Sequence, residues 1–81
     1  MTESPIEMLR SQARATLDLP PPAKCRAIRE AAGVPRAQLA IAIGVSEASI
    51  AFYERGLRSP RGDHRVRYVE ALKALREEVT R

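Results

Sequence analysis

The chain has 81 residues, of which 44% are hydrophobic, and a net charge of +4. This length makes one small domain, without room for both a packed core and a substrate-sized cleft, which argues against an enzyme. The single cysteine, Cys25, excludes an intramolecular disulfide, and no Cys/His cluster has metal-ligand spacing. We therefore expect no catalytic residue, no metal and no cofactor. The longest apolar run, residues 39–43, is too short to span a membrane, which favours a soluble cytoplasmic protein of bacterial or phage type.

The chain begins with a predicted amphipathic helix over about residues 5–17. Ser4 is placed as its N-cap, with Pro5 in the first turn and Glu7 closing a capping box. Apolar residues recur on one face of this helix at Ile6, Leu9, Ala13 and Leu17. Three prolines at 20–22 end it. We expect residues 1–19 to form an accessory helix and residues 20–81 to form the main domain.

Three short helices are predicted next, over about residues 23–32, 35–43 and 46–55, and no alternating β-branched run interrupts them. Gly44 can take the left-handed conformation that ends a helix, and Ser46 is a good N-cap for the following one. Ala40 must be small where the two helices meet, while Val45 and Ile50 fill the angle between them. This spacing predicts a helix-turn-helix in an all-α fold.

Positive charge is concentrated directly after the second helix of this unit. Residues 55–67 contain one acid, Asp63, and five arginines, at positions 55, 58, 61, 65 and 67. The rest of the chain has nine bases and nine acids, so the whole excess lies in this window. Such a distribution indicates a polyanionic partner.

The last predicted helix starts near Asp63 as N-cap and extends to about Val79. A stripe at Tyr68, Leu72, Leu75 and Val79 suits packing on another helix. This stripe and the N-terminal helix are candidate surfaces for a homodimer. The alternative is that the two stripes pack on each other within one chain.

Residues 24–61 resemble the Cro/CI-type (lambda-repressor-like) helix-turn-helix family of phage and bacterial regulators. The resemblance is carried by REAAGV (29–34), QLAIAIGVS (38–46), SI (49–50), YERG (53–56) and RSPR (58–61), with undisturbed spacing. It implies a compact five-helix bundle of the lambda-repressor-like type, here with an extra N-terminal helix. It also implies an ion pair between Arg29 and Glu54 that fixes the angle between their helices.

Two sets of DNA-contacting residues are expected. The resemblance implies phosphate contacts from the first turn of the second helix and from the flanking basic residues: Arg36, Ser46, Arg55, Arg58 and Arg61. Helical geometry turns Ile50 and Tyr53 to the core, so base edges would be met by Glu47, Ala48, Ser49 and Phe52. This set is unusually apolar for the family. Glu47 could accept a hydrogen bond from cytosine, and Ala48 or Phe52 could touch thymine methyl groups.

These features favour a sequence-specific transcription regulator, repressor-like, that binds double-stranded DNA as a homodimer. The second helix of the unit, about residues 46–55, would lie in the major groove. An alternative is a protein-interaction adaptor, such as an antitoxin, an anti-repressor or a factor that binds RNA polymerase. That adaptor would use the apolar surface around Phe52 as its contact.

Overall fold

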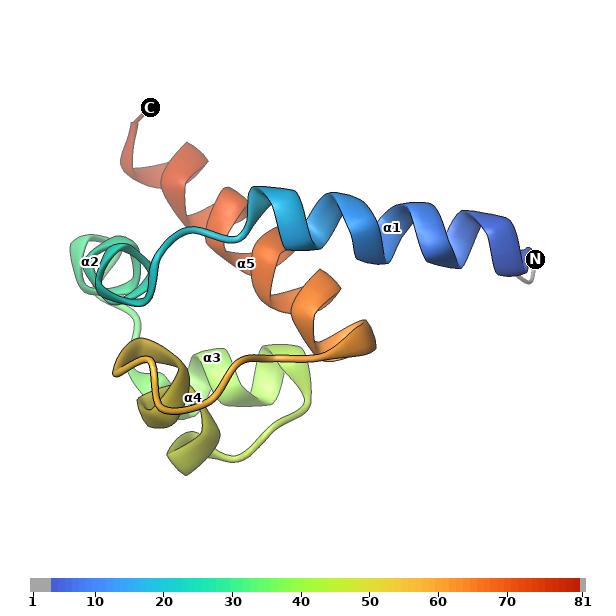
Figure 1. The fold of residues 1–81 in the computed structure, drawn as a ribbon. Coiled ribbons are helices and arrows are strands. Elements are labelled where there is room, and N and C mark those ends of the chain that lie inside the picture. Colours follow the sequence, from blue (N-terminus) through green and yellow to red (C-terminus); the bar gives the residue numbers. More distant parts are fainter. Residues whose placement is uncertain (1–3, 81) are drawn as a thin grey trace.

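The computed structural model describes residues 4–80, which form five helices and no strand (Figure 1). The helices are α1 (Pro5–Asp18), α2 (Pro22–Ala31), α3 (Arg36–Ile43), α4 (Glu47–Glu54) and α5 (Gly62–Val79). The predicted all-α, five-helix fold is confirmed. Residues 1–3 and 81, at the outer ends of the expected units 1–19 and 20–81, lie outside the described residues.

The helix ends follow from local hydrogen bonding. The hydroxyl oxygen of Ser4 accepts the Glu7 N–H at 3.1 Å, and that of Ser46 accepts the Ser49 N–H at 3.1 Å. Gly44 ends α3 in the left-handed conformation, with φ 80°. The expected N-cap of α5 at Asp63 is wrong. His64 N–H already donates to the Arg61 carbonyl at 3.1 Å, so the first turn closes on Arg61 and Asp63 lies inside it.

The core forms where α2, α3 and α4 meet the central helix α5. Its most deeply buried large side chains are Tyr68, Ile43, Ile50 and Leu72. Ala40, 3% exposed, lies in this core and allows α3 and α4 to approach closely, which its small size predicted. The packing of α5 against α1, α2 and α3 makes it the scaffold on which the helix-turn-helix is held.

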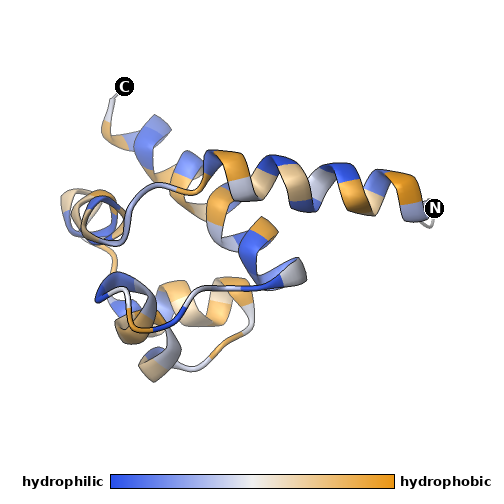
Figure 2. Cartoon of the chain, in the orientation of Figure 1, coloured by the Kyte–Doolittle hydropathy of each residue, from blue (hydrophilic) through white to orange (hydrophobic). Residues whose placement is uncertain are grey.

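Helix α1 packs on α5 with the side opposite its apolar stripe. Ala15 is buried at 3% exposure, whereas Ile6, Leu9 and Leu17 are 63%, 66% and 86% exposed. Hydrophobic residues recur along the whole of α1 in Figure 2. Tyr68 and Leu72 of the α5 stripe are each 1% exposed and lie in the core, so the expectation that this stripe forms a dimer surface is wrong for these two residues. The α1 stripe faces solvent, so it does not pack on the α5 stripe within the chain. That alternative is therefore excluded.

Among residues 4–80, none of the helices has the length and the apolar composition that a membrane-spanning helix needs.

Candidate nucleic-acid interface

A buried carboxylate fixes the end of α4. Glu54, the last residue of α4, has a side chain with 0% exposure and accepts hydrogen bonds from both Nε and Nη2 of Arg29 on α2. The Nη2–Oε1 distance is 2.9 Å. Arg29 also donates to the Val34 carbonyl at 3.0 Å, so its guanidinium connects α2, the following turn and α4. This two-point pairing sets the angle of α4 against the rest of the domain.

The Glu54 carboxylate stays ionised because of its partners. Burial alone would raise its pKa, but hydrogen bonds from Arg29 and Arg36 outweigh burial and lower the pKa below its usual value. The same hydrogen bond to Glu54 raises the pKa of Arg29 against the opposing effect of burial. The group is therefore a compact ionic cluster at neutral pH.

Arg36 belongs to this cluster, which the sequence did not indicate. Its Nε donates to Glu54 Oε1 at 3.1 Å, and its side chain is 35% exposed. The contact forms because the first turn of α3 lies beside the last turn of α4. No local pattern signals it, since the two residues are 18 positions apart. A phosphate contact from the remaining guanidinium nitrogens stays a prediction.

Helix α4 presents the expected surface to solvent. Ile50 and Tyr53 point inward, at 0% and 7% exposure, and Glu47 and Ala48 are exposed. Ser49 and Phe52 are half-buried. The structure therefore keeps all four proposed base-reading residues off the hydrophobic core.

Phe52 lies beneath a cation. The guanidinium carbon of Arg58, in the loop after α4, is 5.4 Å from the centre of the Phe52 ring. An arginine over an aromatic face is attracted by the ring quadrupole. Phe52 therefore lies against Arg58, which is expected to contact phosphate, and this part of the α4 surface carries a positive charge.

The five arginines of residues 55–67 do not all face solvent in the same way. Arg55 and Arg61 are exposed near the C-terminal end of α4 and the start of α5. Arg65 turns inward, where Nε donates to the Pro60 carbonyl at 2.9 Å and Nη1 to Thr16 at 2.6 Å. Arg67 reaches the helix-turn-helix itself: a side-chain carbon built on Gly44 would lie 3.2 Å from its Nη1. Arg67 therefore lies beside the turn between α3 and α4. It is one of the five arginines of residues 55–67, but it was not among the expected DNA contacts.

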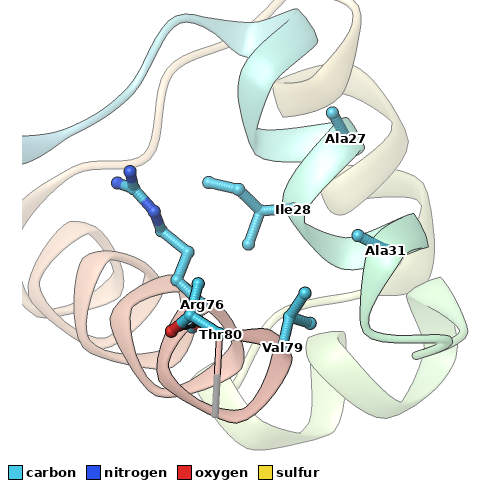
Figure 3. A pocket seen from close by; sticks show the side chains of 6 residues that line it. All are labelled: Ala27, Ile28, Ala31, Arg76, Val79 and Thr80. Carbon is cyan, nitrogen blue, oxygen red and sulfur yellow. Dashed lines mark hydrogen bonds between the residues drawn. The ribbon is translucent and has the colours of Figure 1, made fainter.

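The remaining surface features lie apart from α4. Figure 3 shows a groove between α2 and the C-terminal end of α5, whose lining is almost wholly apolar and includes no α4 residue. Burial raises the pKa of the Cys25 thiol, which makes it a poor nucleophile. Between residues 4 and 80, no group of three His, Cys, Asp or Glu side chains is placed to hold a metal ion.

The arrangement of α3, a glycine turn and α4 across the core is a helix-turn-helix. A family model described as a helix-turn-helix domain matches residues 24–81, and the chain belongs to this Cro/CI-type family. Membership implies DNA binding and a role in transcription regulation, in a family whose members are typically not enzymes. Helix α1 precedes the matched residues. Neither a curated protein nor a solved structure matches the chain.

Proposed function

We propose that the protein is a sequence-specific, repressor-like transcription regulator of bacterial or phage type that inserts α4 into the major groove of double-stranded DNA. The observation that carries this proposal is the orientation of α4. Its inner face is buried and its last residue is held by two arginines, so its outer face is presented at a fixed angle. Rigid presentation of one helix is what major-groove insertion requires.

The proposed contacts are of two kinds. Phosphates would be bound by Ser46 and by the free N–H groups of the first turn of α4. They would also be bound by an arginine at the start of α3 and by four arginines of residues 55–67: Arg36, Arg55, Arg58, Arg61 and Arg67. Base edges would be met by Glu47, Ala48, Ser49 and Phe52. Because this second set holds one charged group, Glu47, much of the affinity would come from phosphates and the remainder from cytosine and thymine contacts.

The regulator would act as a homodimer in the cytoplasm. One α4 helix buries too little surface for tight binding, whereas two copies would occupy half-sites about 34–36 Å apart. Its mechanism would be occupancy of an operator, without chemistry. Helix α1 would be an accessory unit, residues 1–19, added to a DNA-binding unit of residues 20–81.

Selection of bound duplexes from a random pool at physiological ionic strength tests this proposal. We expect an enriched, roughly palindromic sequence. On that duplex Phe52→Ala should change the preferred bases, and Arg61→Glu should weaken all duplexes alike. Failure to enrich any sequence, with no duplex bound even in dilute buffer, would contradict the proposal.

The adaptor alternative depends on Phe52 as an apolar contact. The Arg58 guanidinium over the ring places a positive charge on that surface, which suits a phosphate-lined groove better than an apolar protein surface. A Phe52→Ala chain that loses a protein partner yet binds DNA unchanged would support the adaptor.

A further inference from the structure

We infer that Ser49 meets bases only as a hydrogen-bond acceptor, because its own hydroxyl hydrogen is committed to Ser46. At one position of the duplex the protein would then select an amino base, adenine or cytosine, over guanine and thymine. The inference rests on the proposed insertion of α4 into the major groove. It adds to that proposal the chemistry that one base position must have.

The two hydroxyl groups at the start of α4 are hydrogen-bonded to each other. Ser46 Oγ and Ser49 Oγ are 2.9 Å apart, and either oxygen can be the donor. Ser46 Oγ also accepts the Ser49 N–H at 3.1 Å, which caps the helix. Ser46 is exposed and Ser49 is half-buried, so both side chains reach the surface. The pair therefore lies in the turn of α4 that the proposed function places in the groove.

The pair has two hydroxyl hydrogens, and the bond between the two oxygens uses one of them. A serine hydroxyl has one hydrogen and two acceptor lone pairs. If Ser49 donates to Ser46, the hydrogen of Ser46 is free and Ser49 has only lone pairs to offer. If Ser46 donates to Ser49, the hydrogen of Ser49 is free and Ser46 has none to offer. While the pair is intact, only one of the two residues can donate to DNA.

Phosphate binding favours the first of these arrangements. The first N–H groups of a helix have no acceptor within it, and this end of the helix dipole is positive, so it attracts an anion. Arg67 adds a full positive charge there, since its Nη1 lies beside Gly44 in the turn before Ser46. A hydroxyl that donates to an anionic oxygen makes a stronger bond than one that donates to a neutral base. The free hydrogen therefore belongs to Ser46, and Ser49 donates to Ser46.

An acceptor at a fixed place in the major groove distinguishes amino bases from keto bases. Adenine N6 and cytosine N4 carry amino donors, whereas guanine O6 and thymine O4 are acceptors. Ser49 can accept a hydrogen bond from either amino group. Opposite a keto oxygen, neither atom has a hydrogen to share. Because a single hydrogen bond does not separate adenine from cytosine, we expect one position at which both are selected and guanine and thymine are not.

The neighbouring side chains of the first turn supply no donor that would offset this selection. Glu47 is exposed, and its carboxylate when ionised is only an acceptor. Ala48, also exposed, has no polar side-chain group. The guanidinium of Arg58 lies over Phe52, one turn further along α4. The side chains of the first turn therefore offer bases acceptors and a methyl group.

Duplex selection with the unaltered chain and with Ser49→Ala tests the inference. We expect both proteins to enrich the same sequence except at one position per half-site. There the unaltered chain should select adenine or cytosine, and Ser49→Ala should accept all four bases. Replacing adenine at that position by purine, which lacks the amino group, should weaken binding of the unaltered chain about tenfold and leave Ser49→Ala unchanged.

Three results of this experiment would overturn the inference. One is selection of guanine or thymine by the unaltered chain at the position that Ser49→Ala relaxes. Another is equal weakening of the two proteins by purine. The third is an identical selected sequence for both proteins, since Ser49 would then read no base.

Variants of Ser46 test the commitment of the Ser49 hydrogen. Ser46→Gly removes the hydroxyl while glycine is tolerated as an N-cap. The Ser49 hydrogen is then free, so we expect Ser46→Gly to accept guanine and thymine at the same position and to bind all duplexes more weakly. Ser46→Thr keeps a hydroxyl and should restore the preference for adenine and cytosine. A Ser46→Gly chain that binds weakly but keeps this preference would contradict the inference.

Failure of the inference and failure of the proposed function give different results. If no sequence is enriched and no duplex is bound, the proposed function fails and the inference fails with it. If a sequence is enriched but Ser49 does not select an amino base, DNA binding stands and only the inference fails.

Discussion

Helix α4 turns its large apolar side chains toward the core, whereas helix α1 turns them toward solvent. In α4 the large side chains, Ile50 and Tyr53, are buried. In α1 the large side chains, Leu9 and Leu17, face solvent and the small Ala15 is buried. Periodicity shows which residues share one face of a helix. Whether that face turns to the core or to solvent depends on where the rest of the chain offers an apolar surface to pack against.

The two helices are also held by different forces. Helix α4 is tied to α2 and α3 by a carboxylate with 0% exposure, and it contributes large side chains to the core. Helix α1 is held by Ala15 and by exposed contacts such as Lys73–Asp18, which contribute little free energy in water. Changes at the buried side of α4 should therefore cost far more stability than changes on the outer side of α1.

Glu54→Gln should have the largest effect. The substitution leaves the buried Arg29 charge without its carboxylate, and we expect the free energy of unfolding to fall by about 3–5 kcal/mol. Chemical denaturation monitored by circular dichroism measures this change. Glu47→Gln, at the exposed start of the same helix, is the control and should change stability by about 0.5 kcal/mol or less. Similar losses for both variants would show that the cluster does not anchor α4.

Acid should weaken the same cluster. Because the pKa of Glu54 is lowered in the folded chain, its pairing contributes fully at pH values above its ordinary pKa near 4.5. This contribution is lost as the pH falls from about 4.5 toward the lowered value, where the folded carboxyl takes up its proton. Denaturation midpoints measured between pH 7 and pH 3 should therefore fall more steeply for the unaltered chain than for Glu54→Gln. Parallel curves would contradict the lowered pKa.

A charge placed on the buried side of α1 should reduce stability by a smaller amount. Ala15→Asp buries a carboxylate at a position that is 3% exposed, and we expect a loss of about 1–3 kcal/mol, limited by the free energy with which α1 docks. Ala13→Asp makes the same substitution on the exposed side and is the control. Thermal unfolding at low micromolar protein concentration compares the two variants. Equal losses would mean that α1 is not oriented as described.

Truncation of the α1 stripe should have the smallest effect on the monomer. Leu17 is 86% exposed, so Leu17→Ser should change the free energy of unfolding by about 0.5 kcal/mol or less. The same unfolding experiment at low micromolar concentration measures it. A loss above about 1.5 kcal/mol would place Leu17 in the core of the single chain.

Much of the fold could be predicted because it is encoded locally. The caps at Ser4 and Ser46, the turn at Gly44 and the inward face of α4 depend on neighbouring residues. The Arg29–Glu54 pair required knowledge of a family pattern. The Arg36 contact with Glu54 and the direction of the α1 stripe could not be predicted, because each depends on how separate helices pack.

The salt dependence of duplex binding tests the central claim most directly. Fluorescence anisotropy of a labelled duplex, titrated over a series of salt concentrations, gives the slope of log affinity against log salt. We predict a steep slope equivalent to about three to six phosphate contacts per subunit, reduced by about one contact per subunit in Arg61→Gln. Arg26→Gln, at an exposed position of α2, should leave the slope unchanged. A flat slope, or equal reductions in the two variants, would contradict DNA binding by the α4 surface.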